Sequence, residues 1–166
     1  PISAEAELFL FAASRAQLVA EVIRPALARG SIIVLDRFIH STLAYQGYGR
    51  GLDLELLGHV NRLATQGIEP DLVILLDIDP ERGIGRKRRA QDMSRFEHED
   101  IEFHRRVRQG YLELSRRQAG RWLVVDASRP RAEITRLIWE RVTALLPTRP
   151  AAPPAQASAA QPERLL

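Results

Sequence analysis

The sequence of 166 residues contains no cysteine, a single lysine and no apolar run approaching 18 residues. Without cysteine there can be no disulfide, thiolate metal site or cysteine nucleophile, which is compatible with a cytoplasmic protein. Without a long apolar run, nothing indicates a membrane span. Arginine dominates the basic residues, and the net charge is only +3, so the basic pI is weak evidence for nucleic-acid binding. We therefore expect neither a membrane nor a nucleic acid as partner.

Three short apolar segments, each ending in aspartate, predict buried parallel strands: Ser31–Asp36, Leu72–Asp77 and Trp122–Asp126. Helical patterns separate them. They are Glu5–Ala28 with a kink at Pro25, a helix from Asp53 to Gly67, one beginning at Pro80, Ile101–Ala119, and one from Pro130 to about Leu146. Strands alternating with helices predict an α/β domain with a parallel sheet over residues 1–146. Residues 147–166 are rich in Pro and Ala, which predicts a flexible tail.

The run from Asp36 to Gly47 carries the densest group of polar side chains after a predicted strand. Asp36 and Arg37 would lie at the carboxyl edge of the sheet, where open α/β sheets bind ligands. The Arg37 guanidinium suits a phosphate, and the Asp36 carboxylate can orient it or contact the water shell of a metal. A structural ion pair is the alternative. The groups that follow favour a nucleotide monophosphate: Ser41, Thr42, Tyr45 and Gln46.

The preceding helix places Phe11 and Arg15 four residues apart, on its apolar face. Residues at this spacing lie over one another, so a nucleobase could stack on Phe11 while Arg15 donates to its carbonyl oxygen. The alternative is an arginine whose stem covers a core phenylalanine. Taken alone, the helix favours that alternative.

A basic cluster, Arg86–Arg89, precedes Arg95. It is open to three interpretations: a solvated charged face, a nuclear-localisation or nucleic-acid patch, or a lid whose arginines close over a transferring phosphoryl group. We expect Arg86 to lie inside the helix that begins at Pro80, and Arg88 and Arg89 to lie beyond its end.

Other charged residues give weaker signals. Asp77 and Asp79 could face the same sheet edge, although a strand-terminal aspartate more often caps the next helix. The four histidines, which are His40, His59, His98 and His104, lack the spacing of metal ligands.

Taken together, these motifs resemble the thymidylate kinase family, in particular the bacterial type with arginines in its lid. The matching segments, between about Ala4 and Leu146, are Leu8–Val19, Asp36–Gly47, Glu69–Gly83, Ser94–Glu97 and Val124–Ser128. The resemblance implies a three-layer fold like that of P-loop nucleoside-monophosphate kinases. It also implies phosphoryl transfer from ATP to dTMP giving dTDP, with Mg²⁺, and a homodimer formed through the helix Glu5–Ala28.

The same resemblance implies roles for individual residues. Phe11 would stack on thymine, and Arg15 would bond its O4 edge. Arg37 would bind the substrate phosphate, and Asp36 would lie beside Mg²⁺ and the phosphates. Thr42 and Gln46 would hydrogen-bond the base or its surroundings, and Tyr45 would lie beside the deoxyribose. Arg88 or Arg89, with Arg95, would be the catalytic arginines of the lid. The sequence departs from the family pattern at Phe38, where Tyr is frequent, and at Ser94, where Asp is frequent.

The family's N-terminal P-loop is not in this sequence. No GxxxxGK[ST] motif occurs, and the first residue is Pro1 rather than Met. We therefore expect a piece of a longer kinase that lacks the N-terminal strands, one of which would lie between Ser31–Asp36 and Leu72–Asp77. Without the P-loop, we expect this chain alone to be inactive. The alternatives are a related deoxynucleoside or nucleotide kinase, and a nucleotide-binding module without catalysis.

Overall fold

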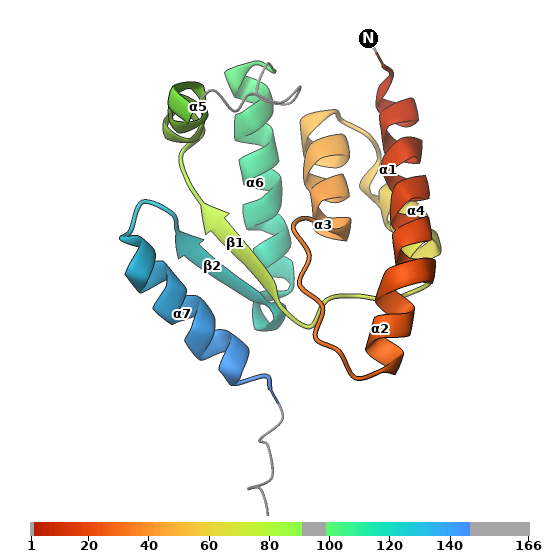
Figure 1. The fold of residues 1–166 in the computed structure, drawn as a ribbon. Helices are drawn as coiled ribbons and strands as arrows, with labels where there is room; N and C mark the ends of the chain where they lie inside the picture. Colours follow the sequence, from red (N-terminus) through yellow and green to blue (C-terminus); the bar gives the residue numbers. More distant parts are fainter. Residues whose placement is uncertain (1, 91–98, 147–166) are drawn as a thin grey trace, which may run out of the picture.

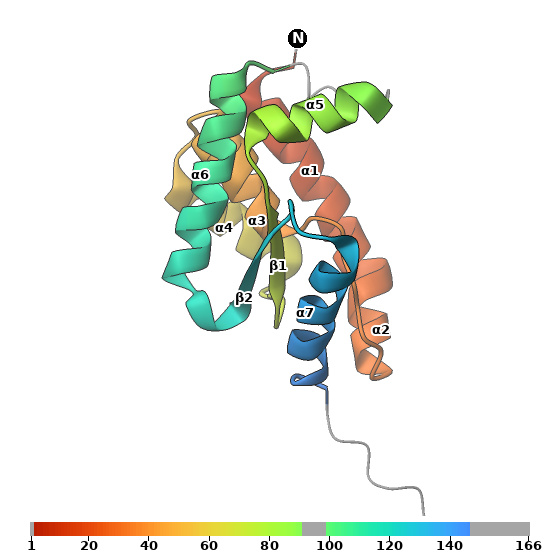
Figure 2. The ribbon, with the colours of Figure 1, turned by 90° about the vertical axis from the view of Figure 1, so that its left-hand side faces the viewer.

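The computed structural model describes residues 2–90 and 99–146, with the backbone alone at 86–90. Its sheet consists of β1 (Val73–Asp77) and β2 (Trp122–Asp126), which are parallel. The register pairs Val73 with Trp122 and Asp77 with Asp126, so both strands end at one edge. Figure 2 shows helices α6 and α7 on opposite sides of the two strands. Two of the three predicted strands are therefore confirmed.

The prediction of a strand at Ser31–Asp36 is wrong for this structure. No described segment pairs with it, and its side chains are open to solvent, with Val34 90% and Ile32 70% exposed. A strand needs a neighbour to bond its backbone groups, however favourable its composition. The described fold is consequently mostly helical with a small parallel sheet (Figure 1).

The long N-terminal helix changes its winding before Pro25. It comprises α1 (Ala4–Leu18), a π-helical turn η1 (Val19–Ile23) and α2 (Arg24–Ala28). Proline has no N–H to donate, and the amide just before it, that of Arg24, donates to the carbonyl of Val19 five residues back. The predicted disturbance at Pro25 thus takes the form of a π-helical turn.

The segment after Arg37 is helical, which the sequence analysis did not predict. It comprises α3 (Ile39–Thr42) and the π-helical segment η2 (Leu43–Gly49), which packs against α6 (Ile101–Arg117). Gly49 permits this approach, since a Cβ there would lie 2.6 Å from Phe103 Cε2. The core between these elements consists of Ala44, Phe103 and Val107, with Tyr45 and Tyr111 packed against it.

Aspartates cap two of the remaining helices, at Asp53 as predicted and at Asp100, which was not predicted. Asp53 Oδ1 accepts from the amide of Leu56 at 2.7 Å, and Asp100 Oδ1 accepts from the amide of Phe103 at 2.6 Å. Within the described residues, no helix is long and apolar enough to span a membrane. These helices are α4 (Leu54–Thr65), α5 (Pro80–Ala90), α6, the 3₁₀ turn η4 (Ala119–Arg121) and α7 (Arg131–Thr143).

Helix α5 corrects one expectation and confirms another. Asp79 Oδ1 accepts from the amide of Glu81 at 3.1 Å, so Asp79 caps the helix. The helix continues to Ala90, so the prediction that Arg88 and Arg89 lie beyond it was wrong. Arginine, lysine and alanine favour helix, and no breaker follows Gly85 within it. The side chains of Arg88 and Arg89, the whole of Arg95 and residues 147–166 fall outside the described residues.

Candidate functional site

Arg37 has an unusual backbone conformation. Its φ is 67°, in the left-handed region that costs a residue with a Cβ about 1–2 kcal/mol. Its guanidinium carbon lies 4.7 Å from the ring centroid of Tyr45. Partial burial lowers the pKa of Arg37, but Tyr45, Tyr111 and Asp36 raise it by more, so the net shift is upward. The result is a permanent cation held over an aromatic face, beside the exposed carboxylate of Asp36.

Arg15 reaches the same chain segment from helix α1. Its Nη1 donates to Asn61 Oδ1 at 3.0 Å, and its Nη2 donates to the carbonyl of Phe38 at 3.4 Å. Burial lowers the pKa of Arg15. Phe11 is 41% exposed, so it is not the core phenylalanine that the structural alternative required. Arg15 therefore contacts the residue that follows Arg37 in the chain, whereas the Arg37 guanidinium lies over Tyr45.

Helix α6 holds the segment that follows Arg37. The hydroxyls of Ser41 and Tyr111 are 2.7 Å apart, and the rings of Tyr45 and Tyr111 meet edge to face at 6.4 Å. Burial raises the pKa of Tyr111 to about 12, so its hydroxyl stays protonated at physiological pH. Tyr111 and Asn61 are site residues that the sequence analysis missed. No local spacing links Ser41 to Tyr111, whereas Asn61 could have been found as a polar residue one turn after the buried Leu57.

Thr42 and Gln46 are both buried, with 1% and 2% of their surfaces exposed. Thr42 Oγ1 has no hydrogen-bond partner among the described residues, which is uncommon for a buried hydroxyl. Gln46 Nε2 donates to Glu7 Oε1 at 2.7 Å. The Gln46 side chain thus joins η2 to α1, while the Thr42 hydroxyl is buried without a partner among the described residues.

The buried carboxylate of Glu7 belongs to a longer chain of charges. Arg50 Nη2 lies 3.5 Å from Glu7 Oε2 and 2.7 Å from Glu99 Oε1. The Arg50 guanidinium also lies 4.8 Å from the ring centroid of Phe103. This arrangement compensates a charge that would be costly to bury alone. It connects α1 with the residue that precedes the cap of α6.

The predicted aspartates differ in their availability, and Asp36 does not lie at the edge of the described sheet because residues 31–36 pair with no described strand. Asp77 accepts both Nε and Nη2 of Arg108, at 2.7 and 2.8 Å, so its charge is paired. The part of the chain that the structure describes contains no group of three or more side chains able to hold a metal ion. Magnesium typically uses one or two carboxylates together with substrate phosphates and water. Asp36, exposed beside Arg37, fits that mode of binding.

Comparison with known proteins shows the family to which this chain belongs. The thymidylate kinase family model matches residues 1–138. The thymidylate kinase of Desulforudis audaxviator is 48% identical over 149 residues, 90% of this chain and 67% of that protein. That of Deinococcus radiodurans is 50% identical over 137 residues, 82% of this chain and 66% of that protein. This chain thus spans about two thirds of either relative.

A solved structure gives the same result for the fold. The crystal structure of thymidylate kinase from Ehrlichia chaffeensis superimposes with a TM-score of 0.64 at 28% identity. The match covers 87% of this chain and 66% of that one. The chain belongs to the thymidylate kinase family, whose members are nucleoside monophosphate kinases of the P-loop class.

Proposed function

We propose that the complete protein transfers the γ-phosphoryl group of ATP to dTMP, giving dTDP. The observation that carries this proposal is that Arg15 contacts the chain segment that bears Arg37. Arg15 donates to the carbonyl of Phe38, which directly follows Arg37. A cation that can bond a base and a cation that can bond a phosphate therefore lie on neighbouring parts of one site, as a nucleoside monophosphate requires.

Each side chain has a role that its surroundings support. Phe11, exposed on α1, would stack on thymine, and Arg15, already oriented by Asn61, would donate to its O4 edge. The unpartnered hydroxyl of Thr42 would bond the base. Tyr45, packed on α6, would form the wall beside the deoxyribose. Gln46 donates to Glu7, so its role would be to hold α1 in position rather than to read the base.

Phosphoryl transfer requires little covalent chemistry from the protein. A phosphate oxygen of dTMP attacks the γ-phosphorus of ATP, and the bond from that phosphorus to the departing ADP oxygen breaks. Arg37 would hold the dTMP phosphate, while Arg88 or Arg89, with Arg95, would spread the charge of the transition state. Asp36 would contact Mg²⁺ or its waters, and the ion would neutralise charge on the phosphates. A part of the enzyme outside this sequence would hold the ATP phosphates.

The proposal includes the three-layer fold of P-loop nucleoside-monophosphate kinases. We infer that a strand of the complete protein, outside this chain, pairs between residues 31–36 and β1. The support for this strand is that apolar side chains are exposed to solvent both along residues 31–36 and on β1. Ile32 and Val34 are 70% and 90% exposed, and Leu76 on β1 is 50% exposed. An added strand would bond the free backbone groups, and the layer of helices packed on it would cover these side chains.

A homodimer through the N-terminal helix is part of the same proposal. Helix α1 leaves Phe9 and Leu10 each 63% exposed, and Val22 of η1 is 52% exposed. Exposed apolar side chains grouped on one helix are typical of protein–protein contacts.

The test is the substitution Arg37→Ala in the full-length enzyme. It removes a charge-assisted contact worth roughly 1.5–3 kcal/mol together with the positioning that depends on it. We expect kcat/KM for dTMP to fall at least about a hundredfold in a coupled ADP-release assay. Arg136→Ala, on the exposed face of α7, is the matched control and should leave the kinetics unchanged. Unchanged kinetics in Arg37→Ala would make Asp36 and Arg37 a structural pair. A wild-type protein that binds dTMP without turnover would be a nucleotide-binding module.

A further inference from the structure

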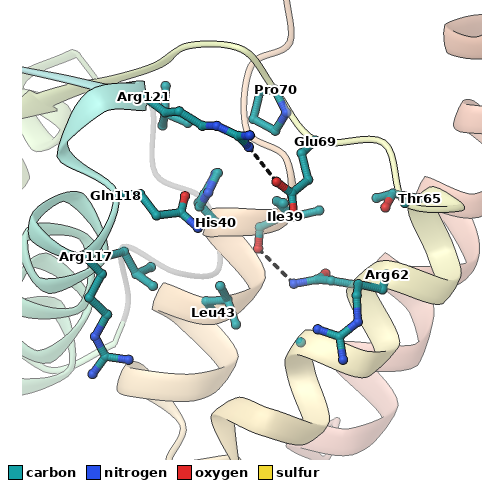
Figure 3. Close-up of a pocket in the computed structure, with 15 residues that line it drawn as sticks. Ile39, His40, Leu43, Arg62, Thr65, Glu69, Pro70, Arg117, Gln118 and Arg121 are labelled. Atoms are coloured by element: carbon teal, nitrogen blue, oxygen red, sulfur yellow. Dashed lines mark hydrogen bonds and ion pairs between the residues drawn. The ribbon is translucent and has the colours of Figure 1, made fainter.

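A cavity lies at the amino-terminal ends of β1 and β2, away from the strand ends that Asp77 and Asp126 mark. Its volume is about 270 Å³, and it is enclosed by α3, α4, the end of α6 and the connection that leads into β1 (Figure 3). It shares Asn61, which orients Arg15, with the proposed dTMP site, but no residue proposed to contact dTMP or to act in catalysis lines it. Its apolar wall consists of Ile39, Leu43, Pro70, Val73 and Leu114.

The rim of this cavity carries more positive than negative charge. Arg62, Arg117 and Arg121 line it, with Glu69 as its carboxylate, and Figure 3 shows the Arg117 guanidinium turned away from the other lining side chains. Arg121 Nη1 lies 2.6 Å from Glu69 Oε2, and Arg117 pairs with Glu113 on its own helix. Within the described ranges, no hydrogen bond or ion pair involves the Arg62 guanidinium. An unpaired guanidinium beside an apolar wall suits an oxyanion.

His40 gives the cavity a neutral hydrogen-bonding group. Its ring meets the Trp122 ring edge to face, with centroids 4.8 Å apart, and makes no hydrogen bond to the described residues. Burial lowers the pKa of His40 to about 4, so at physiological pH the ring offers one donor and one acceptor. Figure 3 shows the Gln118 amide beside it. Both groups lie within reach of a molecule seated against the apolar wall.

We propose that this cavity is a second ligand site, which binds a small organic anion with one phosphate or carboxylate group on an apolar or aromatic body. Arg62 binds the oxyanion at the rim, with Arg121 as a second donor. Ile39, Leu43 and Leu114 contact the body. His40 and Gln118 orient it through hydrogen bonds. A cavity of this size is near the lower end of small-molecule pockets, which excludes a nucleoside triphosphate.

The test measures backbone amide chemical shifts by NMR during titration of the full-length protein. The protein carries Arg37→Ala, which removes the main phosphate contact of the proposed dTMP site. The probes are phenyl phosphate, benzoate and inorganic phosphate. We expect saturable shifts at His40, Gly58, Gly67 and Gln118 with phenyl phosphate or benzoate, and at least about tenfold weaker binding of inorganic phosphate. Comparing the dissociation constants of phenyl phosphate and benzoate identifies whether the site prefers a phosphate or a carboxylate. Gly67 and Gln118 lie away from the residues proposed to contact dTMP, so shifts at these two positions do not depend on whether dTMP is the substrate.

Three variants decide the assignment. Arg62→Met keeps the length of the side chain, and we expect it to weaken binding about tenfold or more. Glu69→Gln removes the opposing carboxylate and frees Arg121, so binding should tighten about threefold, a gain that unfolding cannot mimic. Arg136→Met, a matched arginine on α7, should leave affinity unchanged. The proposal is overturned if no probe gives saturable shifts, if Arg62→Met and Arg136→Met weaken binding equally, or if Glu69→Gln does not tighten it.

Discussion

Burial of His40 makes the stability of this protein depend on pH in a defined window. The pKa of His40 falls to about 4 in the folded protein, against 6.5 for an exposed histidine, because burial disfavours the charged ring. Between these values the unfolded chain holds a proton that the folded protein does not. The contribution of neutral His40 to the free energy of unfolding is therefore complete above about pH 6.5, and it is lost progressively as the pH drops toward 4.

The magnitude follows from the width of the window. At about 1.36 kcal/mol per pKa unit, the loss from His40 approaches about 3 kcal/mol near pH 4. We expect His40→Gln, which cannot titrate, to remove this slope while lowering stability at pH 7. The measurement is urea unfolding of the full-length protein between pH 4.5 and 7.5. The buried Trp122, in contact with His40, provides a fluorescence signal.

Comparison between variants isolates this contribution, since carboxylates also titrate at the acidic end of the range. His59→Gln, on the exposed face of α4, is the matched control and should keep the wild-type slope. Equal slopes for wild type and His40→Gln between pH 5 and 6.5 would refute the reasoning. The ring would then have to be charged, or solvated, in the folded state.

Two further predictions concern packing and the lid. Gly110→Ala should destabilise the protein by about 1–3 kcal/mol in urea unfolding, because the new Cβ would lie 2.5 Å from Tyr48 Cδ2. Gly85→Ala, whose new Cβ would have nothing within 4 Å, should stabilise the protein by about 0.5–1 kcal/mol. Equal effects would contradict this account of α6. In the full-length enzyme, Arg88→Ala with Arg89→Ala should lower kcat about a thousandfold and change the dTMP Kd less than about threefold. Lost dTMP binding with kcat preserved would show that these arginines bind substrate instead.

The sequence predicted the elements that depend on local signals. Asp53 begins α4 because its side chain bonds a free amide, and Gly67, with a φ of 80°, directly follows Gln66, the left-handed residue that ends the helix. The two strands rich in Val, Ile and Leu formed because each has the other as neighbour. Ser31–Asp36 has an equally favourable composition but no partner among the described residues, so composition alone was insufficient.

The candidate site was predictable only in part, for a related reason. Phe11, Arg15 and Arg37 stand out because their types and local spacing suggest ligand chemistry. The partners that orient them come from distant parts of the chain. Asn61 bonds Arg15 across 46 positions and Tyr111 bonds Ser41 across 70. The spacing of Asn61 from the buried Leu57 marks it as a polar residue on a buried helix face, but it does not reveal the partner. The continuation of α5 through Ala90 was missed because a run of basic residues was taken as a helix end, although arginine and lysine favour helix.

The left-handed backbone of Arg37 has a consequence for protein engineering. Glycine and asparagine adopt this conformation more readily than arginine, so replacing Arg37 with either would relieve about 1 kcal/mol of strain. A selection for heat resistance alone would favour those replacements and discard the side chain proposed to hold the substrate phosphate. Libraries built to stabilise this protein should therefore keep position 37 fixed and draw their gains from other positions.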